Sequence, residues 1–152
     1  NLDGWSIVEG KSGRPVSNHA SLPRHKSRPF NHEGEFHLST VATAVGFTDK
    51  QTVVFQSPKF VIQGGRASFL ASGGYDADTL YVGLVDAKTK ELLFTAGGAR
   101  GPQMKRTIWE VGKLKGKTVY LQIVDRKSSG WAHLTFDDFS VDGELELRKK
   151  QK

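Results

Sequence analysis

Leu80-Tyr81-Val82-Gly83-Leu84-Val85 is the stretch of the sequence that decides the fold class. In an extended chain Leu80, Val82 and Leu84 fall on one face, and this period of two is typical of a β-strand with one face in a core. Residues 119–124 repeat the same alternation. No stretch of ten or more residues keeps the apolar period of 3.6 that an amphipathic helix shows. The sequence therefore predicts an all-β protein.

Short strands and turns alternate along most of the chain. Turn residues, mainly glycine, separate the apolar stretches at 64–65, 73–74, 86–89, 97–98 and 128–130. The remaining strands are expected at residues 36–41, 52–56, 60–62, 67–71, 92–96, 105–110 and 131–141. Many short strands with glycine-rich turns are typical of a β-sandwich or a barrel. The 152 residues suit one such domain.

The last of these strands changes its face part of the way along. Its apolar residues are Leu134 and Phe136, followed by Phe139 and Val141. The alternation slips by one residue at Asp137-Asp138, and such a slip predicts a β-bulge.

The amino-acid composition restricts the cellular setting of the protein and the classes of partner that it could bind. The chain has no cysteine, which excludes disulfides and thiol chemistry, and no apolar run near the roughly 18 residues of a membrane span. The formal charge of +6 favours an anionic partner, but much of it comes from the tail 148–152 and the turn 113–117. We expect no nucleic acid partner, because neither a recognition helix nor an aromatic and basic platform is visible. The start at Asn1, without a leader, predicts a domain cut from a larger extracellular protein.

Strand order predicts where the loops lie. If consecutive strands run antiparallel, every second connection lies at the same end of the sandwich. The loops that follow residues 71, 96 and 124 then share one end, and the opposite end keeps short lysine-rich turns. The shared end carries the candidate binding residues Tyr75, Asp76, Asp78, Arg100, Arg126 and Trp131.

These residue types point to carbohydrate recognition. An aromatic ring can stack on the C–H face of a sugar, and charged side chains can hydrogen-bond its hydroxyls. Tyr75 and Trp131 are predicted to stack, and the charged residues of the loops are predicted to bond hydroxyls. Arg24 and His25, from the long loop 18–34, are expected to close the site. The alternative is that the two aromatics only close the edge of the core.

Catalytic motifs are incomplete or absent in the sequence. Residues 32–37 have one residue too many for a zinc-protease motif, and residues 112–118 are one residue short of a phosphate-binding loop. No Gly-x-Ser-x-Gly nucleophile elbow occurs. Asp76, Asp78 and Asp125 could act as paired carboxylates in glycoside hydrolysis, but they lack the hydrophobic neighbours that raise the pKa of an acid. We therefore expect that the protein is not an enzyme.

Several motifs together resemble one known module. They are Leu2-Asp3-Gly4-Trp5 and residues 30–39, 80–87, 115–121 and 129–139. Over about residues 1–143, the chain resembles the galactose-binding-domain-like β-sandwich carried beside the catalytic domains of bacterial fructan hydrolases (levanases, inulinases and β-fructosidases). The resemblance implies a jelly roll of two antiparallel sheets, a secreted or cell-surface setting, and a role in holding polysaccharide near a neighbouring catalytic domain. Residues 144–152 would then be a basic tail or linker.

The resemblance also bears on calcium and on the kind of sugar. Related sandwiches hold a structural calcium ion with a carboxylate of the last strand, and Asp137 and Asp138 match that place. The alternative is that Asp138 only polarises the edge of a strand. The loop 23–30 is more basic than is usual in such modules, which leaves an acidic glycan open beside a neutral fructan. The rival functions are a structural interdomain module that binds no sugar and an adhesin for acidic polysaccharide.

Overall fold

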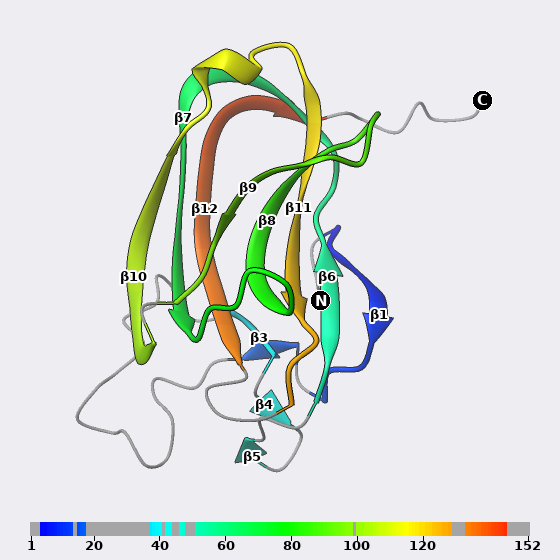
Figure 1. The fold of residues 1–152 in the computed structure, drawn as a ribbon, viewed down its shortest axis with the longest axis vertical. Helices are drawn as coiled ribbons and strands as arrows, with labels where there is room; N and C mark the ends of the chain where they lie inside the picture. The colour runs from blue at the N-terminus through cyan, green and yellow to red at the C-terminus, as the bar shows by residue number, and fades with distance from the viewer. Residues whose placement is uncertain are drawn as a thin grey trace.

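The computed structural model describes residues 4–13, 15–17, 37–40, 42–43, 46–47, 51–98, 100–128 and 133–145. Within these residues, ten strands form one curled antiparallel sheet whose two halves face each other (Figure 1). One half has the order β2 (Val16–Ser17), β3 (His37–Ser39), β12 (Leu134–Leu145), β7 (Phe60–Gly73) and β10 (Gly101–Glu110). The other half has the order β1 (Ser6–Gly10), β6 (Val53–Gln56), β11 (Thr118–Asp125), β8 (Leu80–Asp86) and β9 (Leu92–Ala96). The strands β4 (Ala42–Thr43) and β5 (Gly46–Phe47) pair with each other, and a 3-10 turn, η1 (Gly112–Leu114), precedes β11.

This arrangement is the predicted jelly-roll β-sandwich of antiparallel strands. None of the helical segments in the described part of the chain is long and apolar enough to cross a membrane.

The strand β7 joins the two halves, and here the sequence prediction was wrong. We expected two strands, 60–62 and 67–71, separated by a turn at Gly64-Gly65. Instead the strand is continuous: Val61 pairs with Thr118 of β11, and residues 66–73 pair with β10. A glycine pair permits a sharp bend within a strand as readily as a turn between strands. The pair therefore lies where β7 passes from one half of the sandwich to the other.

The core fills the space between the two halves. Leu80, Val82 and Leu84 of β8 are each no more than 1% exposed, and the alternate residues of β11 are buried with them. The predicted residues of both strands therefore share the core face, but the opposite face of β8 is buried as well, with Tyr81 at 9% and Val85 at 5% exposure. Phe69 of β7 meets Trp109 of β10 edge-on, with ring centroids 4.8 Å apart. Burying each such large apolar side chain stabilises the fold by roughly 1.5–3 kcal/mol.

The predicted bulge is present in β12. The register against β7 shifts between Asp137 and Ser140, and Asp138 has a positive φ of 50°. Phe136 is buried before the shift, and Phe139 packs against the same core after it. The extra residue therefore returns the apolar side chains to the core face.

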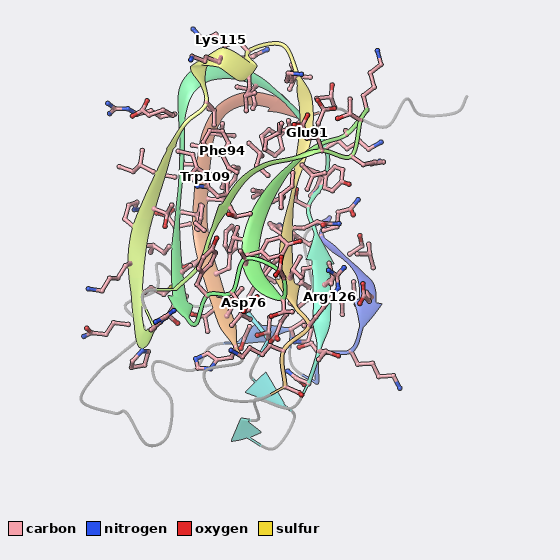
Figure 2. The ribbon with its side chains drawn as sticks, in the orientation of Figure 1. Asp76, Glu91, Phe94, Trp109, Lys115 and Arg126 are labelled. Atoms are coloured by element: carbon pink, nitrogen blue, oxygen red, sulfur yellow. The ribbon has the colours of Figure 1, made fainter. Side chains whose placement is uncertain are left out.

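The two ends of the sandwich differ as the sequence predicted. Figure 2 shows Lys115 at one end and Asp76 and Arg126 at the other. The turns 86–91 and 112–117 form the first, which we call the lysine end. There the backbone N–H of Ala87 donates to the carbonyl of Thr118 at 2.9 Å. We call the opposite end, which carries the loops 73–79, 97–100 and 126–128, the loop end.

Candidate functional site

Backbone hydrogen bonds tie the three loops of the loop end together. The N–H of Gly98 donates to the carbonyl of Gly74 at 3.1 Å, and the N–H of Arg126 donates to the carbonyl of Thr79 at 2.7 Å. The loop 73–79 therefore lies between the other two, and all three share one end as predicted.

Two glycines allow the loop 97–100 to lie directly on the loop 73–79. A Cβ atom at Gly98 would stand 2.3 Å from the backbone N and O of Gly73, and one at Gly97 would stand 2.7 Å from Tyr75. Any side chain at either position would push the two loops apart. The pair Gly97-Gly98 predicts a turn, but the close contact between the two loops depends on distant residues and cannot be predicted from the pair alone.

A cleft of about 510 Å³ opens between these two loops. Its lining residues are Tyr75, Thr95, Ala96, Gly97, Gly98 and Arg100. The cleft is shallow and open, so a ligand would lie against its surface instead of being enclosed. The cleft brings together two of the predicted binding residues, Tyr75 and Arg100, from different loops.

Tyr75 supplies the aromatic surface of the cleft. It is 37% exposed, so it is not simply a core residue. The phenol oxygen shares a hydrogen bond of 3.0 Å with the Thr95 hydroxyl of β9, and the ring packs against Gly97. The ring is therefore held from two sides before any ligand arrives. The sequence does not predict Thr95 as a site residue, because a contact between a strand hydroxyl and a distant loop depends on the path of that loop.

Arg100 supplies the charge of the cleft. The residue is exposed, and its φ of 58° lies in the left-handed region, where a non-glycine residue is disfavoured. The next residue, Gly101, begins β10 and pairs with Gly73. The turn thus presents the guanidinium at the start of a strand that is anchored to the neighbouring loop.

Asp76 has a structural task at the loop end. Its Oδ1 accepts hydrogen bonds from the backbone N–H of Asp78 at 2.9 Å and of Thr79 at 3.0 Å. The bond from Asp78, followed by those from Thr79, lowers the pKa of Asp76 below its ordinary value of 3.8. The side chain of Asp78 is exposed beside this turn. Sugar binding by either aspartate stays a prediction.

Arg126 faces β1 and binds a carboxylate there. Its guanidinium donates to both oxygens of Glu9, at 3.1 Å and 3.0 Å. The hydrogen bond with Glu9 raises the pKa of Arg126, and the same bond lowers the pKa of Glu9. Arg126 is absent from the lining of the cleft, so the structure does not bring it together with Arg100 there. Its role in sugar binding stays a prediction.

The bulge of β12 does not assemble a calcium site from the described residues. Asp138 binds a guanidinium instead, accepting from Nη2 of Arg106 at 2.5 Å. No group of three or more acidic, histidine or cysteine side chains suited to a metal occurs in the described part of the chain, whereas calcium takes about six to eight oxygen ligands. Calcium at Asp137 and Asp138 therefore stays a prediction that needs further ligands, and a chelator that lowers the melting temperature would support it.

Three predicted site residues, Arg24, His25 and Trp131, lie outside the described residues. The predicted boundary after residue 143 also stays untested, although β12 runs to Leu145.

Sequence comparisons find one similar protein. No family model matches the chain. Over 90 residues the chain is 30% identical to a protein of Aspergillus rugulosus named "Putative glycosyl hydrolase ecdE". The match covers 59% of this chain and 12% of that protein, so the chain spans a small part of this relative.

Two solved structures share the architecture. TmCBM61 in complex with β-1,4-galactotriose superposes with a TM-score of 0.52, at 14% identity, over 95% of this chain and 90% of that chain. The K2 cleaved adhesin domain of Lys-gingipain gives a TM-score of 0.50, at 12% identity, over 90% of this chain and 88% of that chain. At these identities the likeness shows a common sandwich fold.

Proposed function

We propose that this chain is a non-catalytic carbohydrate-binding module that holds a polysaccharide or oligosaccharide in the cleft of the loop end. The observation that carries the proposal is the pairing of Tyr75 and Arg100 in one cleft. The ring offers a flat apolar surface to the C–H face of a sugar, and the guanidinium can donate two parallel hydrogen bonds to its oxygens. Because the ring is already fixed by Thr95, binding orders little that was mobile.

The similar proteins support this proposal and suggest a setting. TmCBM61, which shares the fold, was solved with a galactotriose, and the fungal relative carries the name of a glycosyl hydrolase. Both fit a module that lies beside a catalytic domain in a larger secreted or cell-surface protein. The resemblance seen in the sequence adds fructan to the ligands that need testing.

The electrostatics of Asp76 argue against its acting as a general acid. A general acid in glycoside hydrolysis needs a raised pKa, so that it still carries its proton near neutral pH. The pKa of Asp76 moves in the opposite direction, because backbone N–H groups stabilise its ionised form. Asp76 therefore suits the turn and not proton donation.

Calorimetric titration with matched variants tests the proposal. The ligands are β-1,4-galacto-, fructo- and galacturono-oligosaccharides. Replacing Tyr75→Ala should weaken the binding of whichever sugar the wild type binds by about 2 kcal/mol, or about thirtyfold. The control Lys115→Ala, at the lysine end, should bind like the wild type.

The melting temperature separates loss of binding from loss of folding. Since Tyr75 is 37% exposed and outside the main core, the Tyr75→Ala variant should melt at a somewhat lower temperature but stay folded at the temperature of the titration. Normal binding by this variant would exclude the cleft as the site. If no sugar binds the wild type, a structural interdomain module becomes the first choice.

A further inference from the structure

Arg100 differs from the other arginines in the described part of the chain. Each of the others donates to a carboxylate: Arg66 to Glu110 at 3.1 Å, Arg106 to Asp138 at 2.5 Å and Arg126 to Glu9 at 3.0 Å. Arg100 is exposed in the cleft and has no carboxylate partner among the residues that the structure describes. The planar guanidinium of Arg100 therefore keeps its hydrogen-bond donors available at the place where a ligand would lie.

The cleft offers hydrogen-bond donors without a carboxylate acceptor. Its described polar side chains are Tyr75, Thr95 and Arg100, and the first two bond to each other. Asp76 follows Tyr75 in the chain, but its Oδ1 is held by the backbone of its own turn. A neutral sugar presents hydroxyls that donate as well as accept, whereas an ionised oxyanion only accepts. The side chains of this cleft therefore suit an ionised oxyanion better than a neutral sugar.

The backbone of Arg100 adds an independent observation. A φ of 58° is the conformation for which glycine carries no steric penalty, yet an arginine occupies the position. A disfavoured backbone angle is retained when the side chain or its surroundings require it, and such residues concentrate at binding sites. Lys90 and Asp138 have similar angles, so the angle supports a role for the Arg100 side chain only together with its open position in the cleft.

We infer that the sugar bound in this cleft carries an oxyanion, either the carboxylate of a uronic acid or a sulfate ester, and that Arg100 binds it while the sugar ring lies against Tyr75. This inference rests on the proposed function, and names the class of carbohydrate. Two parallel N–H bonds from one guanidinium to two oxygens make such a contact both strong and directional.

The test compares acidic sugars with a neutral counterpart of similar size. Trigalacturonate, its methyl ester and a sulfated galactotriose are titrated into the full chain at about 0.15 M salt, where exposed charges beyond about 8 Å are screened. We expect trigalacturonate or the sulfated sugar to bind about tenfold or more tightly than the neutral ester. Which of the two binds identifies the oxyanion.

Three variants assign the effect to Arg100. Arg100→Gln should reduce the preference to less than about twofold, and Arg100→Gly should do the same while the melting temperature stays equal or rises, because glycine accepts the backbone angle. Arg66→Gln, which removes a paired arginine elsewhere, should keep the full preference.

The outcomes separate this inference from the proposed function. Equal binding of acid and ester, both lost in Tyr75→Ala, would overturn the acidic sugar and keep the sugar site. No binding of any of the three sugars would overturn the acidic sugar, and the titrations with galacto- and fructo-oligosaccharides would then decide the proposed function. A preference that falls as much in Arg66→Gln as in Arg100→Gln would reflect net charge and would also overturn the inference.

Discussion

The two ends of the sandwich carry the same kind of turn and use it differently. Asp76-Ala77-Asp78-Thr79 precedes β8, and Asp86-Ala87-Lys88-Thr89 follows from its end. In both turns Oδ1 of the first aspartate accepts from the backbone N–H groups two and three residues later. This is the Asx turn, in which a short side chain replaces a backbone acceptor. Local chemistry therefore does not distinguish the two ends.

What distinguishes them is the packing of the neighbouring loops. At the lysine end Oδ2 of Asp86 also accepts from Nζ of Lys117 at 3.2 Å, and Asp86 is only 4% exposed. At the loop end the turn of Asp76 is joined to two other loops, and a cleft remains beside it. A turn motif fixes the backbone locally, but long-range packing decides whether a recess forms next to it.

The largest effect should come from adding a methyl group to Gly98 at the loop end, compared with the same change at the lysine end. Gly98→Ala places Cβ 2.3 Å from the backbone of Gly73, so the loops must separate. We expect a loss of about 3 kcal/mol in the free energy of unfolding, measured by urea denaturation, together with loss of sugar binding.

Gly112→Ala is the control at the lysine end, because the nearest atom to its Cβ would be 3.8 Å away. It should change stability by less than about 0.5 kcal/mol. Equal losses would show that the loop end is packed no more tightly.

Local patterns predicted much of this molecule. The alternation in β8, the bulge at Asp137-Asp138 and the shared end of three loops all follow from residues close together in sequence. Tyr75 and Arg100 were found because antiparallel strand order places their loops at one end.

The errors and omissions involve contacts between distant residues. The pair Gly64-Gly65 predicts a turn but forms a bend within β7, since a glycine pair alone does not distinguish a turn from a bend at the corner of a sheet. The partner of Arg126, Glu9, is 117 residues away along the chain, on an edge strand whose path no local pattern gives. The hydroxyl of Thr95 is likewise assigned to Tyr75 by tertiary structure alone.

The second largest effect should be a difference between the two turns in how the stability of the protein depends on pH. Hydrogen bonds from Thr89 and then Lys88 lower the pKa of Asp86 below 3.8, and the ammonium of Lys117 acts in the same direction. Because the folded state lowers this pKa, the stabilisation is present above about pH 4 and is lost as the pH falls through the folded value. Asp86→Asn keeps the turn acceptor but not the charge, so its melting temperature should depend less on pH than that of the wild type.

Asp76→Asn is the matched change at the loop end. The pKa of Asp76 is also lowered, first by Asp78 and then by Thr79, while Lys127 acts on it only at a distance and forms no ion pair with it among the described residues. We therefore expect a smaller change in the pH dependence between about pH 2 and pH 7 than Asp86→Asn produces. A larger change for Asp76→Asn would show that the turn of Asp76, and not that of Asp86, contributes more to the pH dependence of stability.

The smallest effect should come from the hydroxyl that positions the ring. Thr95→Val removes the partner of the Tyr75 phenol and keeps the shape of β9, so the ring becomes freer to turn within the cleft. Sugar affinity should fall by about 0.5–1.5 kcal/mol, as is usual for one hydrogen bond, while the melting temperature barely moves, since the bond is exposed. Tyr75→Phe removes the other half of the bond and keeps the ring, and should weaken binding by a similar amount. If the two losses are not additive in the double variant, the bond itself positions the ring. Additive losses would mean that each hydroxyl contacts the sugar separately, and the cleft would then bind by direct contact instead of by a ring fixed in advance.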